Sequence, residues 1–144
     1  MTSASISGRP RQTDDARWRS IAADLVFWSV VGAIVATLSG PLAQWWNVPR
    51  AELFVGGLAF LVGGVALLFG LNRIRPTSRG LVLGFGVSNL LLAPTVWAAA
   101  SLGWLPLRAA GNWALVCAGG VALVLGVWQL TTLQRSRHTH HRGG

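Results

Sequence analysis

Charged and chemically reactive side chains are scarce in this sequence. Only 11% of its 144 residues are charged, it has no tyrosine, and its one cysteine is Cys117. A soluble domain carries about 25% charged residues. One cysteine excludes an internal disulfide, and its position inside an apolar run indicates packing. With 52% hydrophobic residues, the composition predicts an integral membrane protein.

Four apolar stretches lack most residues that carry chemistry. They lie at about 21–39, 53–71, 81–100 and 113–130 and contain no His, Lys, Arg, Glu, Tyr or Met. Haem ligation, a buried metal site and a Ser-His-Asp triad therefore cannot be assembled within them. We expect no catalytic residue, no cofactor and no metal in the membrane, and hence no enzyme. The tail "RSRHTHHRGG" could bind a divalent metal weakly, but a basic tail near lipid headgroups is the simpler interpretation.

Each apolar stretch approaches the ~20 residues that a helix needs to cross a bilayer. None shows the polar alternation of a strand, and helices satisfy their backbone groups internally. The sequence thus predicts an all-α membrane four-helix bundle with up-down-up-down topology. Its parts are an N-terminal cytoplasmic segment at 1–19, the four-span domain at 20–134 and a basic tail at 135–144.

The arginines predict the orientation. Ten of the twelve lie before the first span, between the second and third, or after the last, whereas Arg50 and Arg108 lie in the other two gaps. Cytoplasmic loops carry such an excess, so both termini are expected inside. The cytoplasmic set near anionic headgroups includes Arg17, Arg19, Arg73, Arg75, Arg79, Arg135 and Arg137. Because these residues flank spans, we expect no nucleic acid partner. Arginine without lysine indicates a bacterial genome, hence the inner membrane.

Two segments are nearly identical. "GGVALLFG" at 63–70 ends the second span and "GGVALVLG" at 119–126 ends the fourth, with six of eight positions identical. The chance alternative is that these small apolar residues dominate any bacterial span. A Trp, Pro and Arg precede both spans, which favours a helical hairpin repeated in parallel.

Small residues at helical spacing predict how the helices pack. Such faces let backbones approach closely in lipid. The candidate packing residues are Gly32, Ala36, Gly63, Gly84, Ala118, Ala122 and Gly126, and Gly56, Gly63 and Gly70 recur one heptad apart. Some of these faces should close the bundle, and one could pair protomers as a homodimer or contact a membrane-protein partner.

Asp24 and Asn89 are the polar intramembrane candidates. Asn89 lies near the middle of its span, where an amide should find an interhelical partner, although a ligand contact is possible. Asp24 lies near the inner boundary, within reach of Arg17, Arg75, Arg79 or Arg135. An Asp–Arg pair would make Asp24 structural. A functional Asp24 remains the alternative, because an intramembrane acid is a candidate site by default.

The segments "NVPRAELFVGGLAFLVGGVALLFGLNR" and "GVSNLLLAPTVWAAASLGWLPLRAAGNW" resemble small four-span bacterial integral membrane proteins of unassigned function. The resemblance covers about residues 20 to 134 and implies no catalytic residue. In size, span number and an acid in the first span, the chain also resembles the small multidrug resistance exporters. Those carry an essential carboxylate in mid-span, whereas Asp24 lies near the edge, so their mechanism is not carried over.

Three functions remain, in order of preference. The first is a structural or accessory membrane protein that binds a partner or itself through its small-residue faces. The second is a small transporter or channel that uses Asp24 and Asn89. The third is an enzyme of membrane lipid metabolism, which the missing acid–base groups disfavour.

Overall fold

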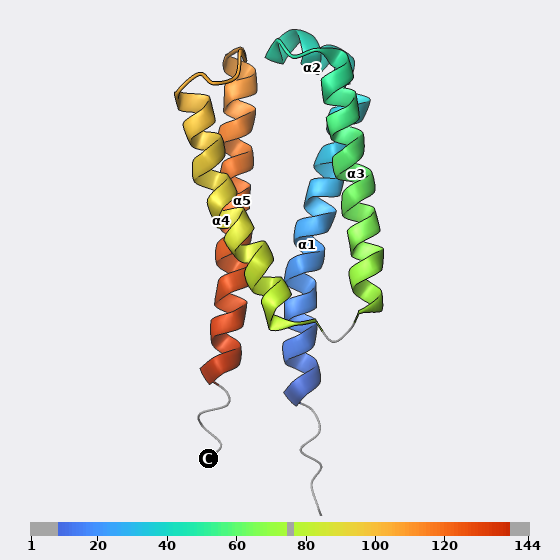
Figure 1. Cartoon of the computed structure of the whole chain (residues 1–144), viewed down its shortest axis with the longest axis vertical. Helices are drawn as coiled ribbons and strands as arrows, with labels where there is room; N and C mark the ends of the chain where they lie inside the picture. Colours follow the sequence, from blue (N-terminus) through green and yellow to red (C-terminus); the bar gives the residue numbers. More distant parts are fainter. Residues whose placement is uncertain (1–8, 75–76, 139–144) are drawn as a thin grey trace, which may run out of the picture.

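The computed structural model describes residues 9–74 and 77–138, and in this part of the chain it contains helices and no strands. There are five helices: α1 (Arg9–Thr37), α2 (Ser39–Trp46), α3 (Arg50–Arg73), α4 (Arg79–Ser101) and α5 (Ala109–His138). The prediction of an all-α bundle is confirmed. Figure 1 shows the four long helices running in alternating directions, with the short α2 at one end.

The four long helices are apolar and long enough to cross a membrane, over Asp14–Thr37, Arg50–Arg73, Arg79–Ser101 and Ala109–Gln134. Large apolar side chains such as Val55, Phe69 and Val124 are exposed on their sides. A water-soluble protein rarely exposes so much contiguous apolar surface. The protein is therefore an integral membrane protein whose lateral surface contacts lipid.

The helices associate as two hairpins, α1 with α3 and α4 with α5. In the first hairpin the backbones touch at glycines. A Cβ atom added to Gly32 would lie 2.6 Å from the carbonyl oxygen of Gly57, and one added to Gly57 would lie 2.6 Å from the amide nitrogen of Ala36. No side chain fits in that space, so the sequence must have glycine here for the two helices to approach this closely.

The second hairpin uses the same principle with different neighbours. A Cβ atom on Gly126 would lie 2.9 Å from the carbonyl oxygen of Gly86. One on Gly119 would meet the indole of Trp97 at 2.5 Å. The Trp97 indole nitrogen donates a hydrogen bond of 3.0 Å to the carbonyl oxygen of Val116. The glycines of α5 therefore make room for both a backbone and an indole of α4.

The two hairpins meet through α1, which contacts α5 and, less extensively, α4. In the described residues α3 approaches neither α4 nor α5 closely enough for helix packing. An apolar cluster of Ile21, Leu25, Val82 and Leu133 forms the core of the junction. Near it, the carboxylate of Asp14 accepts a 2.7 Å hydrogen bond from the amide of Thr77, just before α4.

The other ends of the hairpins are joined by α2 and the loop that follows α4. The Arg108 guanidinium donates to the Gln44 carbonyl oxygen at 2.9 Å, and the Asn47 amide donates to the Pro106 carbonyl oxygen at 3.0 Å. Asn47 ends α2 in the left-handed conformation, with φ of 59°. α2 itself is absent from the sequence prediction. Pro41 stands in its first turn, where proline is tolerated because the N–H of that position has no helical partner.

The near-identical octapeptides do not pack alike. In α5, Gly119 and Gly126 lie against α4, whereas at the aligned positions of α3 a Cβ on Gly63 or Gly70 would meet no atom within 4 Å. Instead, Gly57 and Gly64 of α3 face α1. The two segments thus share a sequence but present it to different surroundings.

Candidate functional site

Three polar side chains from three helices meet between the hairpins. The Asn89 amide of α4 donates to Asp24 Oδ2 of α1 at 2.6 Å, and the Gln129 amide of α5 donates to the same oxygen at 2.9 Å. Asn89 also donates to Gln129 Oε1 at 3.3 Å. Asp24 is 2% exposed, Asn89 6% and Gln129 0%. We call these three residues the polar cluster.

Helix periodicity places each member on an inward face. Asn89 follows Val82 and Gly86 on the buried face of α4, and Gln129 follows Ala122 and Gly126 on that of α5. Side chains three and four residues apart share one side of a helix. The buried faces of the second hairpin therefore deliver two amides to the place where α1 supplies its acid.

One oxygen of the cluster has no partner. Asp24 Oδ2 accepts two hydrogen bonds, whereas Oδ1 is buried and accepts none from the described residues. A buried polar atom without a hydrogen bond carries its full desolvation cost, which is largest for a charged group. The hydrogen bonding of the polar cluster is therefore incomplete at Asp24 Oδ1, which belongs to the carboxyl group that both amides contact.

The expected Asp24–Arg pair does not form among the described residues. Asp24 contacts amides instead, and its second oxygen has no partner. Arg17 lies seven residues earlier on α1, and its Nε is also buried without a hydrogen bond. Arg75 lies outside the described residues, and the side chain of Arg135 is not described. The physical reason is position: Asp24 points into the junction, where the second hairpin offers two amide donors.

Asn89 has an interhelical partner, in agreement with the prediction for a mid-span amide. Gln129 is not among the candidate residues that the sequence predicted. Gln129 is an uncharged polar residue at the end of the fourth stretch, one turn beyond the small residues Ala122 and Gly126. That position on the small-residue face was the signal that could have identified it.

The predicted packing residues divide into two groups. Gly32, Ala36 and Gly126 lie at close backbone contacts, and Ala122 is fully buried, while Ala118 is half-buried. Gly63 and Gly84 pack against no other helix in the described residues, since a Cβ on either would meet nothing within 4 Å. Their faces point away from the neighbouring helices. Gly64 is the opposite case: it is not among the predicted packing residues, yet a Cβ there would collide with the hydroxyl of Ser29.

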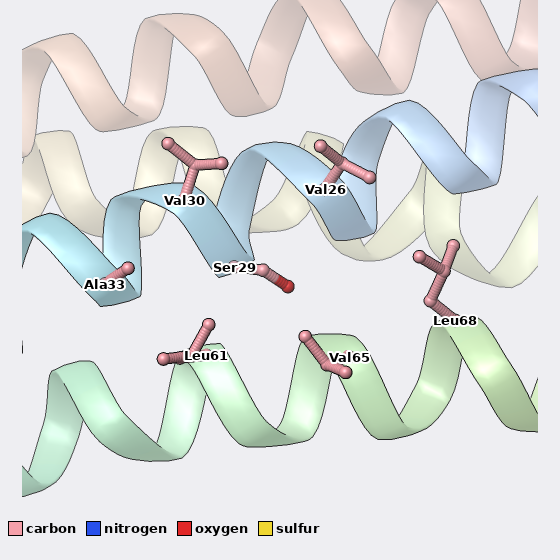
Figure 2. A pocket seen from close by; sticks show the side chains of 7 residues that line it. All are labelled: Val26, Ser29, Val30, Ala33, Leu61, Val65 and Leu68. Atoms are coloured by element: carbon pink, nitrogen blue, oxygen red, sulfur yellow. The ribbon is translucent and has the colours of Figure 1, made fainter.

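A groove runs between α1 and α3 (Figure 2), and it is separate from the polar cluster. Its lining is apolar except for Ser29, whose hydroxyl donates to the Leu25 carbonyl oxygen at 2.7 Å. The other lining residues are Val26, Val30, Ala33, Leu61, Val65 and Leu68. The surface of this groove is therefore almost entirely apolar.

The described members of the predicted cytoplasmic set lie at one end of the molecule. Arg17 and Arg19 belong to the start of α1, Arg73 ends α3 and Arg79 begins α4. Figure 1 shows these helix ends together with the end of α5, where Arg135 and Arg137 lie. Arg19, Arg73 and Arg79 are exposed, and Arg17 is half-buried. The fold thus gathers the basic residues at the end opposite α2.

The fold and the polar cluster define a four-span helical membrane protein with a buried carboxyl–amide cluster. Comparisons with protein families, with curated proteins and with solved structures gave no match to this chain.

Proposed function

We propose that the protein is a structural or accessory component of a bacterial inner membrane, and that it assembles with a second copy of itself through α3. The observation that carries this proposal is a row of small residues on α3, at whose glycines an added Cβ would meet no described atom within 4 Å. We call it the α3 stripe, and it consists of Gly56, Ala59, Gly63, Ala66 and Gly70.

The α3 stripe follows a heptad pattern without interruption. Its members are spaced alternately by three and four residues, which keeps them on one side of a helix that packs at a small crossing angle. A Cβ on Gly56, Gly63 or Gly70 would meet nothing within 4 Å, and Ala59 and Ala66 are exposed. A second helix could therefore approach this side as closely as α1 approaches the other.

α3 is also the least buried of the four membrane-spanning helices. Among the described residues its backbone lies close to α1 and α2 and to no other helix. Just 17% of its most apolar window is buried, compared with 22% to 28% for the other three. Lipid gives two apolar helices little reason to associate, so contact depends on close backbone packing at small residues. The α3 stripe meets that requirement on the most accessible helix of the molecule.

Symmetry supports a second copy as the occupant. Copies inserted in the same orientation hold their α3 helices parallel, and a twofold axis along the membrane normal brings the stripe against itself. Each small residue then faces its own counterpart along the whole span. Such an interface is self-complementary, with no side chain large enough to hold the helices apart.

The proposal includes the orientation of the protein in the membrane. With both termini in the cytoplasm, the exposed Arg19, Arg73 and Arg79 would lie at the headgroups of the inner leaflet. Juxtamembrane arginines are attracted to anionic lipids there. This basic end supports an accessory role at the cytoplasmic surface. The proposal includes no catalytic activity.

Two glycine variants test the assembly. Gly63→Leu fills the α3 stripe, and Gly120→Leu adds the same side chain at an α5 glycine that also has no atom within 4 Å. The mass of the protein in mild detergent, measured by light scattering, should be that of a dimer for the wild type and Gly120→Leu. It should be that of a monomer for Gly63→Leu. A monomeric wild type, or a Gly63→Leu variant that remains dimeric, would refute the proposal.

The unpartnered oxygen of Asp24 favours a second candidate function, a small transporter or channel that uses Asp24 and Asn89. An intramembrane acid with a free oxygen is suited to bind and release a cation. Liposomes containing the protein should then pass cations, and Asp24→Asn should abolish the flux while the variant remains folded. Equal flux in the wild type and in Asp24→Asn would eliminate this candidate.

A further inference from the structure

We propose that the polar cluster of Asp24, Asn89 and Gln129 is a binding site for one monovalent alkali cation. This inference does not depend on assembly through α3. It names a substrate class for the second candidate function, but it concerns binding at equilibrium. A protein that binds the cation and does not transport it would satisfy the inference and fail the transport candidate.

The first support is the carboxyl group itself. Asp24 is 2% exposed, and within the described part of the chain its Oδ1 has no hydrogen-bond partner. No described arginine is paired with it. Buried charges are normally paired or coordinate a metal, because removing a lone charge from water is costly. A cation at Oδ1 would complete the one unsatisfied position of the cluster.

The second support is the chemistry of the two neighbours. Asn89 and Gln129 both donate to Asp24 Oδ2, at 2.6 Å and 2.9 Å, so both amides lie at the carboxyl group. An amide carries a carbonyl oxygen opposite its NH₂ group, and a half-turn about the last side-chain bond exchanges the two. The same residues can therefore offer two N–H donors to a bare carboxylate or two oxygens to a cation beside it.

Charge selects a monovalent ion. The cluster contains one carboxyl group and two neutral amides, so one positive charge neutralises it. A divalent ion would leave a net charge of about +1 in the junction, at the desolvation cost of an uncompensated charge. Carboxylate and amide oxygens are hard ligands that suit hard cations, whereas soft metals prefer sulfur. Sodium is the first ion to test, followed by potassium.

A bound cation would also account for the origin of the polar cluster, whose three side chains come from three different helices. Asp24 belongs to the first hairpin, whereas Asn89 and Gln129 belong to the second. An ion shared by the three side chains would link the hairpins where α1 meets α4 and α5. Cation binding should therefore stabilise the folded arrangement, since a ligand that binds only the native state raises its stability.

Thermal unfolding of the purified full-length protein in detergent tests the site. Sodium chloride is compared with N-methylglucamine chloride at equal ionic strength. The midpoint of the wild type should rise by a few degrees with sodium and follow a single-site saturation curve. Asp24→Asn keeps an oxygen for the amides to bond and loses the charge, so it should fold and lose the sodium response. Ser29→Ala, another buried polar position on α1, should keep it.

Gln129→Leu provides a second test if Asp24→Asn does not fold. It removes one ligand oxygen and leaves the carboxyl group, so the sodium concentration at half-saturation should rise at least tenfold. Equal midpoints for the wild type in sodium, potassium and N-methylglucamine chloride would overturn the proposal. A sodium response that persists in Asp24→Asn would show a general salt effect and also overturn it. A response to calcium and not to sodium or potassium would contradict the monovalent assignment.

Discussion

Gly63 and Gly64 are consecutive residues of α3 that face different surroundings. A Cβ atom on Gly63 would meet nothing within 4 Å, whereas one on Gly64 would collide with the Ser29 hydroxyl and lie 3.1 Å from the Leu25 carbonyl oxygen. Gly64 therefore allows α1 to pack closely against α3, whereas Gly63 lies on the α3 stripe. Substitutions at these two positions should therefore act on different properties: the stability of the fold at Gly64, and the assembly of two copies at Gly63.

Gly64→Leu should destabilise the first hairpin. The added side chain must displace α1, and overpacking of a tight contact costs about 1–3 kcal/mol. Reversible unfolding in mixed detergent micelles should therefore show a lower free energy of unfolding for the double variant Gly63→Leu, Gly64→Leu than for Gly63→Leu alone, both of which are expected to be monomeric. Equal stability of the two monomeric variants would mean that α1 and α3 are not in close contact at Gly64.

Asp24→Leu should destabilise the junction more than Asp24→Asn does. Leucine leaves the Asn89 and Gln129 amides without their shared acceptor, whereas asparagine retains a carbonyl oxygen in that position. The loss of the acceptor should cost about 1–2 kcal/mol, since an unsatisfied buried donor costs about 1–3 kcal/mol and hydrogen bonds within membranes contribute somewhat less. The same unfolding measurement checks this, in sodium-free buffer. If Asp24→Leu is as stable as Asp24→Asn, the two amides do not depend on the carboxyl group.

Asn47 should tolerate glycine better than alanine. Its φ of 59° is a left-handed conformation that glycine adopts freely, while an alanine there costs about 1–2 kcal/mol. Both variants lose the hydrogen bond to the Pro106 carbonyl oxygen. Asn47→Ala should therefore unfold at a lower temperature than Asn47→Gly, and the reverse order would contradict the turn geometry.

Cysteine labelling should reveal the orientation. In a Cys117→Ala background, Leu105→Cys lies in the loop after α4, and Ile74→Cys follows α3 at the opposite end; both native side chains are exposed. A membrane-impermeant maleimide added to intact spheroplasts should label residue 105 and not residue 74. Labelling should become equal after the membrane is permeabilised. The opposite pattern would place the termini outside.

The sequence predicted the four long helices because twenty apolar residues without charges have few alternatives. The stretch expected at about 53–71 lies within Arg50–Arg73, and that at about 81–100 lies within Arg79–Ser101. The short α2 was not predicted, because it lies almost wholly beyond the apolar stretch expected at about 21–39. In the structure α1 ends at Thr37, and Pro41 stands near the start of the next helix.

Which faces meet was harder to predict than where the helices lie. Gly63 and Gly64 are both glycines, and helical spacing alone predicted Gly63 as a packing position and not Gly64, whereas Gly64 is the one that packs against α1. Only the partner helix decides between them, and in lipid no difference in hydrophobicity marks the buried side. The same limit applies to Asp24: its depth was compatible with an arginine partner, but its direction on α1 brought it to Asn89 and Gln129.

Disulfide cross-linking along α3 tests assembly through the α3 stripe most directly. Single cysteines replace Ala59, Ala66 or, as a control on another exposed face, Leu58. All are made in the Cys117→Ala background and oxidised in native membranes. A disulfide needs Cβ atoms about 3.5–4.5 Å apart, which parallel helices in contact achieve at a and d positions. We expect cross-linked dimers at residues 59 and 66 and none at residue 58. Equal cross-linking at all three positions, or none at residues 59 and 66, would contradict the proposed assembly.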